Sequence, residues 1–173
     1  MVFQSFYEKD FALPTRAFFR GLLFFYGLEV THLKPNSIAQ ITIFIHLCKA
    51  FLGITPHLNL KRALYHLRGY PSAARRNVVS CATFSLHQSR SYLAQGLRDS
   101  NKGWEKEWFV VSDLAPCLPA RTGRAPESRA CWEELLTEEE MIQVNLLLDE
   151  IAGLSAQGLT GAVMVLSFSK RLV

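Results

Sequence analysis

Apolar residues recur at helical spacing in three consecutive segments near the N-terminus, and each segment is bounded by proline or glycine. The segments run from Pro14 to Gly27, from Pro35 to Gly53 and from Pro56 to Leu67. Proline is tolerated in the first turn of a helix, because its missing N–H has no partner there, and glycine readily takes the left-handed conformation that ends a helix. The pattern therefore predicts three short helices.

Within these segments the apolar positions lie three or four residues apart, which is the spacing of one buried helix face. They are Phe18, Leu22 and Tyr26 in the first segment, Ile38, Ile41, Ile45, Cys48 and Leu52 in the second, and Leu60, Leu64 and Leu67 in the third. Asn36 or Ser37 is placed to cap the second helix, whose β-branched residues also fit a strand locally. The length of the segment and the flanking Gly53 favour a helix.

The middle of the chain follows a different pattern. Residues 69–77 contain glycine, proline and adjacent arginines, and they predict an exposed loop. Residues 78–86 are rich in Val, Thr and Phe with partial alternation, so they predict a strand, and residues 91–97 are its predicted partner. Residues 108–111 predict a further short strand. Prolines and a glycine predict an irregular loop over residues 113–131.

Two helices are predicted near the C-terminus. Thr137 and Glu140 form a capping box, in which each side chain bonds the backbone N–H of the other residue. The apolar stripe that follows consists of Val144, Leu147, Leu148, Ile151 and Leu154. This helix is expected to end near Gly158. Thr160 is placed to cap a last helix over Ala162–Arg171, although β-branched residues there leave a strand open.

These elements predict an α+β fold that is mainly helical, with three N-terminal helices, a small antiparallel sheet and two C-terminal helices. We expect residues 1–173 to form a single domain. Its helical part is residues 11–68, its small sheet and loop are residues 78–131, and its C-terminal helices are residues 137–172. A chain of 173 residues can bury roughly 70% of its unfolded surface, and 49% hydrophobic residues are typical of a globular protein.

Charge is distributed unevenly along the chain. Residues 1–50 hold five Lys/Arg and three Asp/Glu, residues 51–131 hold twelve and five, and residues 132–173 hold two and seven. The basic middle and the acidic C-terminal part can attract each other within one fold. Alternatively, the basic part stays free to bind a polyanion.

A nucleic-acid-binding surface is the best alternative function that this charge pattern offers. The candidate residues lie between positions 61 and 98 and are interleaved with tyrosines. They are Lys61, Arg62, Arg68, Arg75, Arg76, Arg90 and Arg98. Cations that contact phosphates and rings that stack under bases suit a single strand. An ordinary basic surface that faces the acidic C-terminal helix explains the same pattern, and the sequence leaves both interpretations open.

The sequence contains no motif typical of a catalytic, metal or cofactor site. Its five histidines and four cysteines lack the close spacing of zinc ligands, and neither a nucleophile elbow nor a glycine-rich phosphate loop occurs. Asp99, Asp113 and Asp149 match a carboxylate triad only by spacing, because the first two lie in turn-like sequence and the third in an acidic helix. We therefore predict that the protein is not an enzyme and binds no cofactor.

Targeting signals are not evident either. Glu8, Lys9 and Asp10 interrupt the N-terminus before a signal peptide could form, and His46 and Lys49 interrupt the most apolar stretch. The cysteines show no close pair, which fits a reducing compartment. We expect an intracellular protein without a membrane partner, and the sequence leaves nucleus and cytoplasm open.

Several short motifs occur in a specific order and spacing. They are Phe3–Ser5–Phe6, Phe11 to Pro14, Phe18–Phe19–Arg20–Gly21, Tyr26–Gly27–Leu28, His32–Leu33–Lys34–Pro35–Asn36, Phe44–Ile45–His46–Leu47–Cys48, Leu52–Gly53–Ile54, Pro56–His57, Ser100–Asn101–Lys102–Gly103–Trp104, Trp108–Phe109 and Leu159–Thr160–Gly161. This order resembles the gypsy-type transposon domain family of plant genomes, which is also labelled a gypsy-type transposase. The resemblance extends over nearly the whole chain and is densest at residues 11–67.

The resemblance implies a protein captured from, or encoded by, a long-terminal-repeat retrotransposon of a plant. It brings no catalytic residues with it, and the chain lacks the Asp-Thr-Gly of a retroelement protease and a zinc knuckle. We therefore expect a gag-region-like interaction or assembly domain whose partner is a second copy or another protein. Alternatives are a nucleic-acid-binding module that uses residues 61–98 and an inactive transposase remnant. The weak match at residues 67–81 and the missing charged extension lead us to expect a truncated copy.

Overall fold

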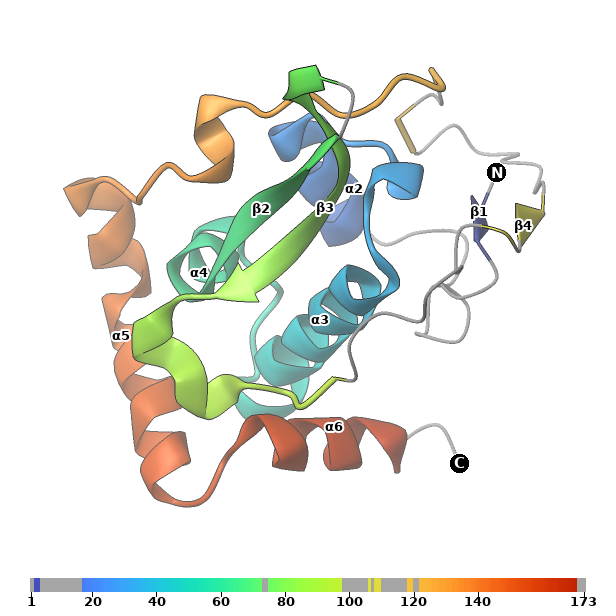
Figure 1. Ribbon diagram of the computed structural model, residues 1–173. Coiled ribbons are helices and arrows are strands. Elements are labelled where there is room, and N and C mark those ends of the chain that lie inside the picture. Colours follow the sequence, from blue (N-terminus) through green and yellow to red (C-terminus); the bar gives the residue numbers. More distant parts are fainter. Residues whose placement is uncertain are drawn as a thin grey trace. The chain divides into compact units, whose positions relative to one another are not determined.

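The structure is a computed structural model that describes residues 2–3, 17–72, 75–97, 106, 108–109, 118–119 and 122–170. The described residues form a mainly helical α+β fold, as the sequence predicts (Figure 1). They group into two compact units, each built from three stretches of chain. The first unit comprises Met1–Thr42, Leu67–Phe84 and Arg98–Glu133, and the second comprises Ile43–His66, Ser85–Leu97 and Glu134–Val173. The expected single domain stays a prediction.

The first unit begins its helical part with α2 (Ala17–Tyr26), which buries one stripe of large apolar side chains. The buried residues are Phe19, Leu22, Leu23 and Tyr26. Gly27 follows with a φ of +64°, and the side chain of Arg129 lies where a Cβ atom would be. Glycine is therefore required there twice, by conformation and by space. The first predicted helix is confirmed over its described residues and at its C-terminal end.

The second predicted helix is also confirmed, with a change of geometry. Helix α3 (Pro35–His46) begins at the predicted proline, continues as the π-helical turn η2 (Leu47–Phe51) and ends before Gly53. Ser37 does not serve as an N-cap. Its hydroxyl instead accepts a hydrogen bond from the Phe84 N–H and donates one to Thr83 Oγ1, so it joins α3 to a strand of the first unit.

The sheet prediction is partly wrong. Strand β3 (Arg75–Leu86) contains the predicted strand, but its partner is β2 (Tyr65–Ser72), which precedes it in the chain. The third predicted helix is correspondingly shorter, because α4 (Leu58–Leu64) ends where β2 begins. The predicted exposed loop at 69–77 is largely strand. The predicted partner at 91–97 starts instead in the 3₁₀ helix η3 (Gln88–Leu93).

Leu64, Tyr65 and Leu67 explain why the sequence misled us. Leu64 and Leu67 fit a helical stripe that starts at Leu60, but Tyr65 and Leu67 also fit the two-residue period of a strand. In the structure Tyr65 and Leu67 are buried and Arg68 is exposed, so the strand period holds from residue 65 to residue 68.

The remaining elements of the first unit are short. Strand β1 (Val2–Phe3) pairs antiparallel with β4 (Trp108–Phe109), which confirms the described half of the strand predicted at 108–111. Within the predicted loop at 113–131, the described residues are irregular up to the 3₁₀ helix η5 (Ala130–Trp132). The indole N–H of Trp132 donates to the Tyr26 carbonyl at 2.9 Å and thereby ties η5 to α2.

The second unit is dominated by α5 (Glu138–Ala156) and α6 (Gly161–Ser169), both predicted from the sequence. Thr137 and Glu140 form the expected capping box, and Thr160 caps α6 through the Val163 N–H, so the open strand alternative is excluded. Helix α4 packs against α5 (Figure 1). Gly161 lets α6 approach the backbone of Ala94, since a Cβ atom would overlap it.

No single helix among the described residues has the length and apolar composition to cross a membrane. Helices α5 and α6 meet this requirement only as a pair, and they are bent by 87° relative to each other.

Candidate functional site

Helix α5 carries large apolar residues on two opposite faces. On the inner face Val144, Leu148 and Ile151 are buried. On the outer face Ile142 and Leu146 are 71% and 80% exposed. An amphipathic surface helix normally keeps its apolar residues on the buried face alone. The apolar outer face of α5 is therefore a feature of the second unit that core packing does not explain.

Acidic residues lie on both sides of the exposed pair. Glu139 precedes Ile142 by three residues and Asp149 follows Leu146 by three, and both acidic side chains are exposed. The spacing of three, four and three residues places these four side chains on one helix face. We call Glu139, Ile142, Leu146 and Asp149 the outer row.

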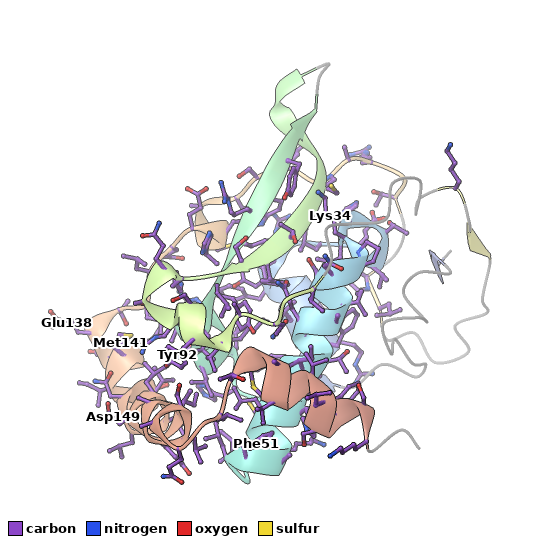
Figure 2. All side chains as sticks on the ribbon, turned by 60° about the horizontal axis from the view of Figure 1, so that its bottom comes forward. Lys34, Phe51, Tyr92, Glu138, Met141 and Asp149 are labelled. Atoms are coloured by element: carbon purple, nitrogen blue, oxygen red, sulfur yellow. The ribbon has the colours of Figure 1, made fainter. Side chains whose placement is uncertain are left out.

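The helix as a whole is strongly acidic. It contains five Asp/Glu residues and no Lys or Arg. Besides the two acids of the outer row, Glu138 and Glu150 are also exposed, and Figure 2 labels Glu138 and Asp149 near the two ends of this acidic stretch. The apolar pair of the outer row is thus surrounded by negatively charged side chains.

The fifth acidic residue, Glu140, fixes the orientation of α5. Its Oε1 lies 2.7 Å from Nη1 of Arg62 on α4, whose side chain is 6% exposed. The hydrogen bond from the Thr137 N–H, followed by Arg62, lowers the pKa of Glu140. Asn59, one turn earlier on α4, donates to Gln143 at 3.3 Å. These two contacts hold one side of α5 against α4 and leave the outer row exposed.

The seven predicted nucleic-acid-binding residues have different environments. Lys61 is 0% and Arg62 is 8% exposed, so neither can contact a nucleic acid in this structure. Arg68 is exposed, and Arg90 is partly exposed. The side chains of Arg75 and Arg76 and all of Arg98 lie outside the described residues. The contiguous basic surface therefore loses its two members on α4, and the part played by the others stays a prediction.

A second feature of the basic region does fit a polyanion. Arg68 and Tyr70 alternate on β2, so their side chains share one face of the strand, and both are exposed. The ammonium of Lys34 lies 3.3 Å from the centroid of the Tyr70 ring. In the first unit Lys34 therefore contacts an aromatic ring, and Arg68 lies on the same strand face as that ring. The sequence pattern included Arg68 and Tyr70 but missed Lys34, which precedes them by more than thirty residues.

Lys61 belongs to a buried cluster in the second unit. Its nitrogen lies 3.4 Å from the centroid of the Tyr65 ring and 5.1 Å from that of Phe44. Burial lowers the pKa of Lys61 and raises the pKa of Tyr65, whose hydroxyl accepts from Gln95 Nε2 at 2.8 Å. Burial also raises the pKa of the Cys48 thiol to about 11. The environment favours the neutral form of each group, so Cys48 lacks the thiolate character that a nucleophile needs.

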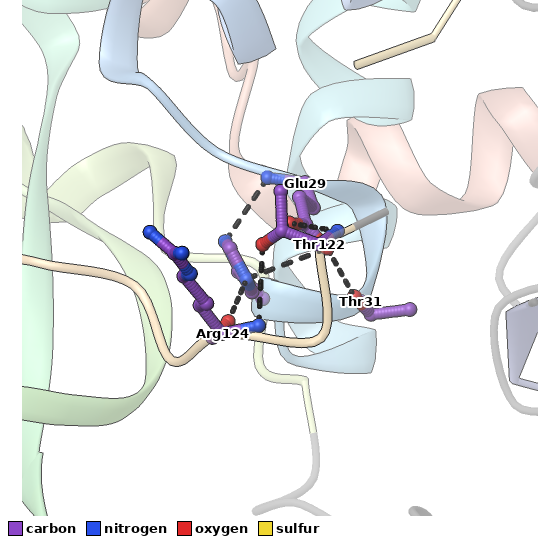
Figure 3. A network of polar contacts seen from close by, with 5 residues as sticks. Glu29, Thr31, Thr122 and Arg124 are labelled. Atoms are coloured by element: carbon purple, nitrogen blue, oxygen red, sulfur yellow. Dashed lines mark hydrogen bonds and ion pairs between the residues drawn. The ribbon is translucent and has the colours of Figure 1, made fainter. Parts of the chain in front are cut away.

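A polar network in the first unit was missed by the sequence. Glu29 is 7% exposed, and its Oε1 accepts from the N–H and the hydroxyl of Thr122 at 2.8 and 2.6 Å (Figure 3). His32 Nδ1 accepts from the Glu29 N–H at 3.0 Å, so the ring proton resides on Nε2, which donates to the Arg124 carbonyl at 2.9 Å. The bonds from Thr122 and to the Arg124 carbonyl tie residues 122–124 to η1 (Val30–His32) and to its N-cap, Glu29.

The network is therefore best described as a structural link between residues 122–124 and η1. A Glu and a His 3.7 Å apart also occur in acid–base catalysis, but here both ring nitrogens and both carboxylate oxygens bond the protein itself. Burial lowers the pKa of His32, against the opposing effects of the Arg124 carbonyl and Glu29. Within the described part of the chain no three His, Cys, Asp or Glu residues are grouped as metal ligands.

Comparison with known proteins identifies one family. The model of the family described as "Putative gypsy type transposon" matches residues 1–69. The predicted resemblance is confirmed over these residues, which include α2, α3, η2 and α4. The searches of curated proteins and of solved structures found no match. The plant origin and the resemblance beyond residue 69 stay predictions.

Proposed function

We propose that this chain is a non-enzymatic, gag-region-like interaction domain of a gypsy-type retroelement, and that it binds protein through the outer row of α5. The observation that carries the proposal is the exposure of Ile142 and Leu146 on a helix whose opposite face already fills the core. Covering either side chain would contribute roughly 1.5–3 kcal/mol, which is a substantial part of a specific contact.

The polar clusters support a binding function over catalysis. Glu29 and His32 form hydrogen bonds with residues 122–124, and the Lys61 cluster is buried among aromatic rings. The side chains of both clusters are thus engaged with other residues of the same unit. A binding domain requires only that such clusters hold a rigid surface in place.

The proposal is tested with two double variants of the full chain. Ile142→Ser with Leu146→Ser removes the apolar pair of the outer row. Val163→Ser with Leu166→Ser is the matched control, because it removes two exposed apolar residues of α6 in the same unit. Self-association is measured by sedimentation velocity over a concentration series, and binding of a partner helix is measured by anisotropy with labelled amphipathic peptides that carry a Leu-x₃-Leu pair.

Association in either assay that is lost in the α5 variant and kept in the α6 variant supports the proposal. If wild-type protein neither self-associates nor binds any peptide, the proposal is wrong. It is equally wrong if both double variants lose binding to the same extent, since the outer row would then have no special part in it.

Nucleic-acid binding is a second candidate, favoured by Lys34, Arg68 and Tyr70 in the first unit. Cations beside an exposed ring suit the phosphates and bases of a single strand. This candidate predicts that affinity for single-stranded RNA falls steeply with salt and drops further in Arg68→Ala. The exposed Arg129, changed to Ala, is the matched control for the loss of one positive charge. The third interpretation, an inactive transposase remnant, predicts binding in neither assay.

A further inference from the structure

The outer row of α5 also indicates what kind of partner it binds, an inference that depends on the proposed function. We propose that the occupant is a basic amphipathic helix. Two apolar residues four positions apart would contact Ile142 and Leu146, and a Lys or Arg three positions beyond each of them would contact Glu139 and Asp149.

Spacing sets the length of this partner helix. Glu139 and Asp149 are ten residues apart, which corresponds to about 15 Å along the helix axis. A nearly parallel or antiparallel partner that presents basic residues at the same separation reaches both acids while its apolar pair covers the centre. Long Lys and Arg side chains can also cover apolar surface with their methylene groups. The apolar pair therefore supplies binding energy, and the two acids select the partner by charge.

Charge argues against a second copy of α5 as the occupant. The outer row is symmetric about Val144, since Glu139 and Ile142 lie as far before it as Asp149 and Leu146 lie after it. An antiparallel pair of α5 helices would place each Glu139 beside the other copy's Asp149. A parallel pair would place each acid beside its own counterpart. Both arrangements bring negative charges close together, and α5 has no basic residue to compensate them.

The experiment compares three labelled helical peptides that share one Leu-x₃-Leu pair. They differ only at two positions, one three residues before the pair and one three residues after it. Those two positions are Lys in the first peptide, Gln in the second and Glu in the third. Affinity for the full chain is measured by anisotropy at low, physiological and high salt. We expect the Lys peptide to bind about fivefold more tightly than the Gln peptide, as two charge pairs would give. Salt should shrink this advantage, and the Glu peptide should bind most weakly.

Substitutions in the protein locate the effect. Glu139→Gln with Asp149→Asn should lower the affinity for the Lys peptide to that for the Gln peptide and leave the Gln peptide unaffected. Glu133→Gln with Glu134→Gln removes the same charge from exposed positions outside α5, and it should preserve the preference for Lys. A preference for Lys that survives the first variant or disappears in the second would contradict the inference.

The outcomes separate this inference from the proposed function. Equal binding of all three peptides, lost on Ile142→Ser with Leu146→Ser, overturns the basic partner and leaves the interaction domain standing. A dimer at physiological salt that depends on the same two residues also overturns the basic partner, because a second copy would then occupy the row. Failure of every peptide together with failure to self-associate overturns both.

Discussion

The side-chain nitrogen of Lys61 lies in the core of the second unit, where burial opposes its charge and the rings of Tyr65 and Phe44 favour it. Burial lowers the pKa of Lys61 well below 10.5. Below pH 10.5 the unfolded chain binds a proton here more readily than the folded chain, and this difference destabilises the fold. We therefore expect Lys61→Met to raise the free energy of unfolding at pH 7 by about 1–3 kcal/mol.

The stability difference between Lys61→Met and wild type should depend on pH. The advantage of Lys61→Met over wild type should shrink as the pH rises toward 10.5 and vanish above it, because the lysine is then neutral in the unfolded chain as well. Urea unfolding at several pH values between 7 and 11 measures it. Lys49→Met, at an exposed lysine, is the control and should change stability by less than about 0.5 kcal/mol. A destabilised Lys61→Met would show that the cation–π contacts outweigh burial.

His32 provides a second prediction of pH dependence. Burial lowers its pKa, and protonation of Nδ1 would break the bond from the Glu29 N–H. The unfolded chain therefore binds the proton first as the pH falls below about 6.5, so this part of the stability is complete above that pH and is lost below it. His32→Asn should lower stability at pH 7.5 by roughly 1–2 kcal/mol and flatten the dependence between pH 5 and 7.

Urea unfolding at half-unit pH steps is the measurement, with His57→Asn as the control at an exposed histidine. An unchanged slope in His32→Asn would mean that other groups cause the acid sensitivity of the protein.

The sequence could show how many charges residues 58–64 carry but not which ones are buried. Leu60, Lys61, Arg62 and Leu64 are all buried, so this two-turn helix is covered on more than one side. An amphipathic pattern assumes one buried face, and on that assumption Lys61 and Arg62 belong to the solvent side. Only the tertiary partners, Tyr65 for Lys61 and Glu140 for Arg62, show otherwise.

At the scale of elements, the N-terminal caps of α5 and α6 were the features best predicted from sequence. The capping box of Thr137 and Glu140 and the cap at Thr160 depend on residues within one turn, so local sequence determines them. Thr137→Ala should destabilise the protein by about 1 kcal/mol, whereas Thr137→Ser should be close to wild type. Thermal unfolding followed by circular dichroism checks this expectation. A neutral Thr137→Ala would mean that packing against α4 alone holds the start of α5.

The hairpin of β2 and β3 was missed because strand pairing depends on distant sequence. Residues 58–67 satisfy a helical period and, in their second half, a strand period as well. Pro71 also argues against a strand in the middle of a sheet. In a sheet of two strands, however, each strand is an edge, where proline is tolerated. The end of α4 is therefore set by the strand pairing of the residues after Leu64, and not by the helical propensity of the segment.

The apolar outer row was visible in the sequence as Ile142 and Leu146, but its exposure was not. Most residues of α5 from 141 to 148 are apolar. Such a segment fits a fully buried helix as well as a helix with two apolar faces. The contacts from Asn59 and Arg62 of α4 select the face that turns inward.

At the scale of the whole molecule, both units are assembled from stretches that are far apart in the chain. The first unit joins α2 to Trp132, and the second joins α4 to Glu140. The region matched by the family model, residues 1–69, holds the helices α2, α3 and α4 but neither of these partners. It also ends within β2, before any residue of β3.

We therefore expect residues 1–69 alone not to fold cooperatively. The fragment leaves the apolar faces of α2 and α4 without their C-terminal partners, and isolated helices of seven to twelve residues are marginal in water. Far-ultraviolet circular dichroism should show a broad, gradual melt for the fragment and a sigmoidal melt for the full chain. Near-ultraviolet spectra should show fixed aromatic packing only in the latter. A sharp transition in the fragment would mean that the matched region is a folding unit by itself.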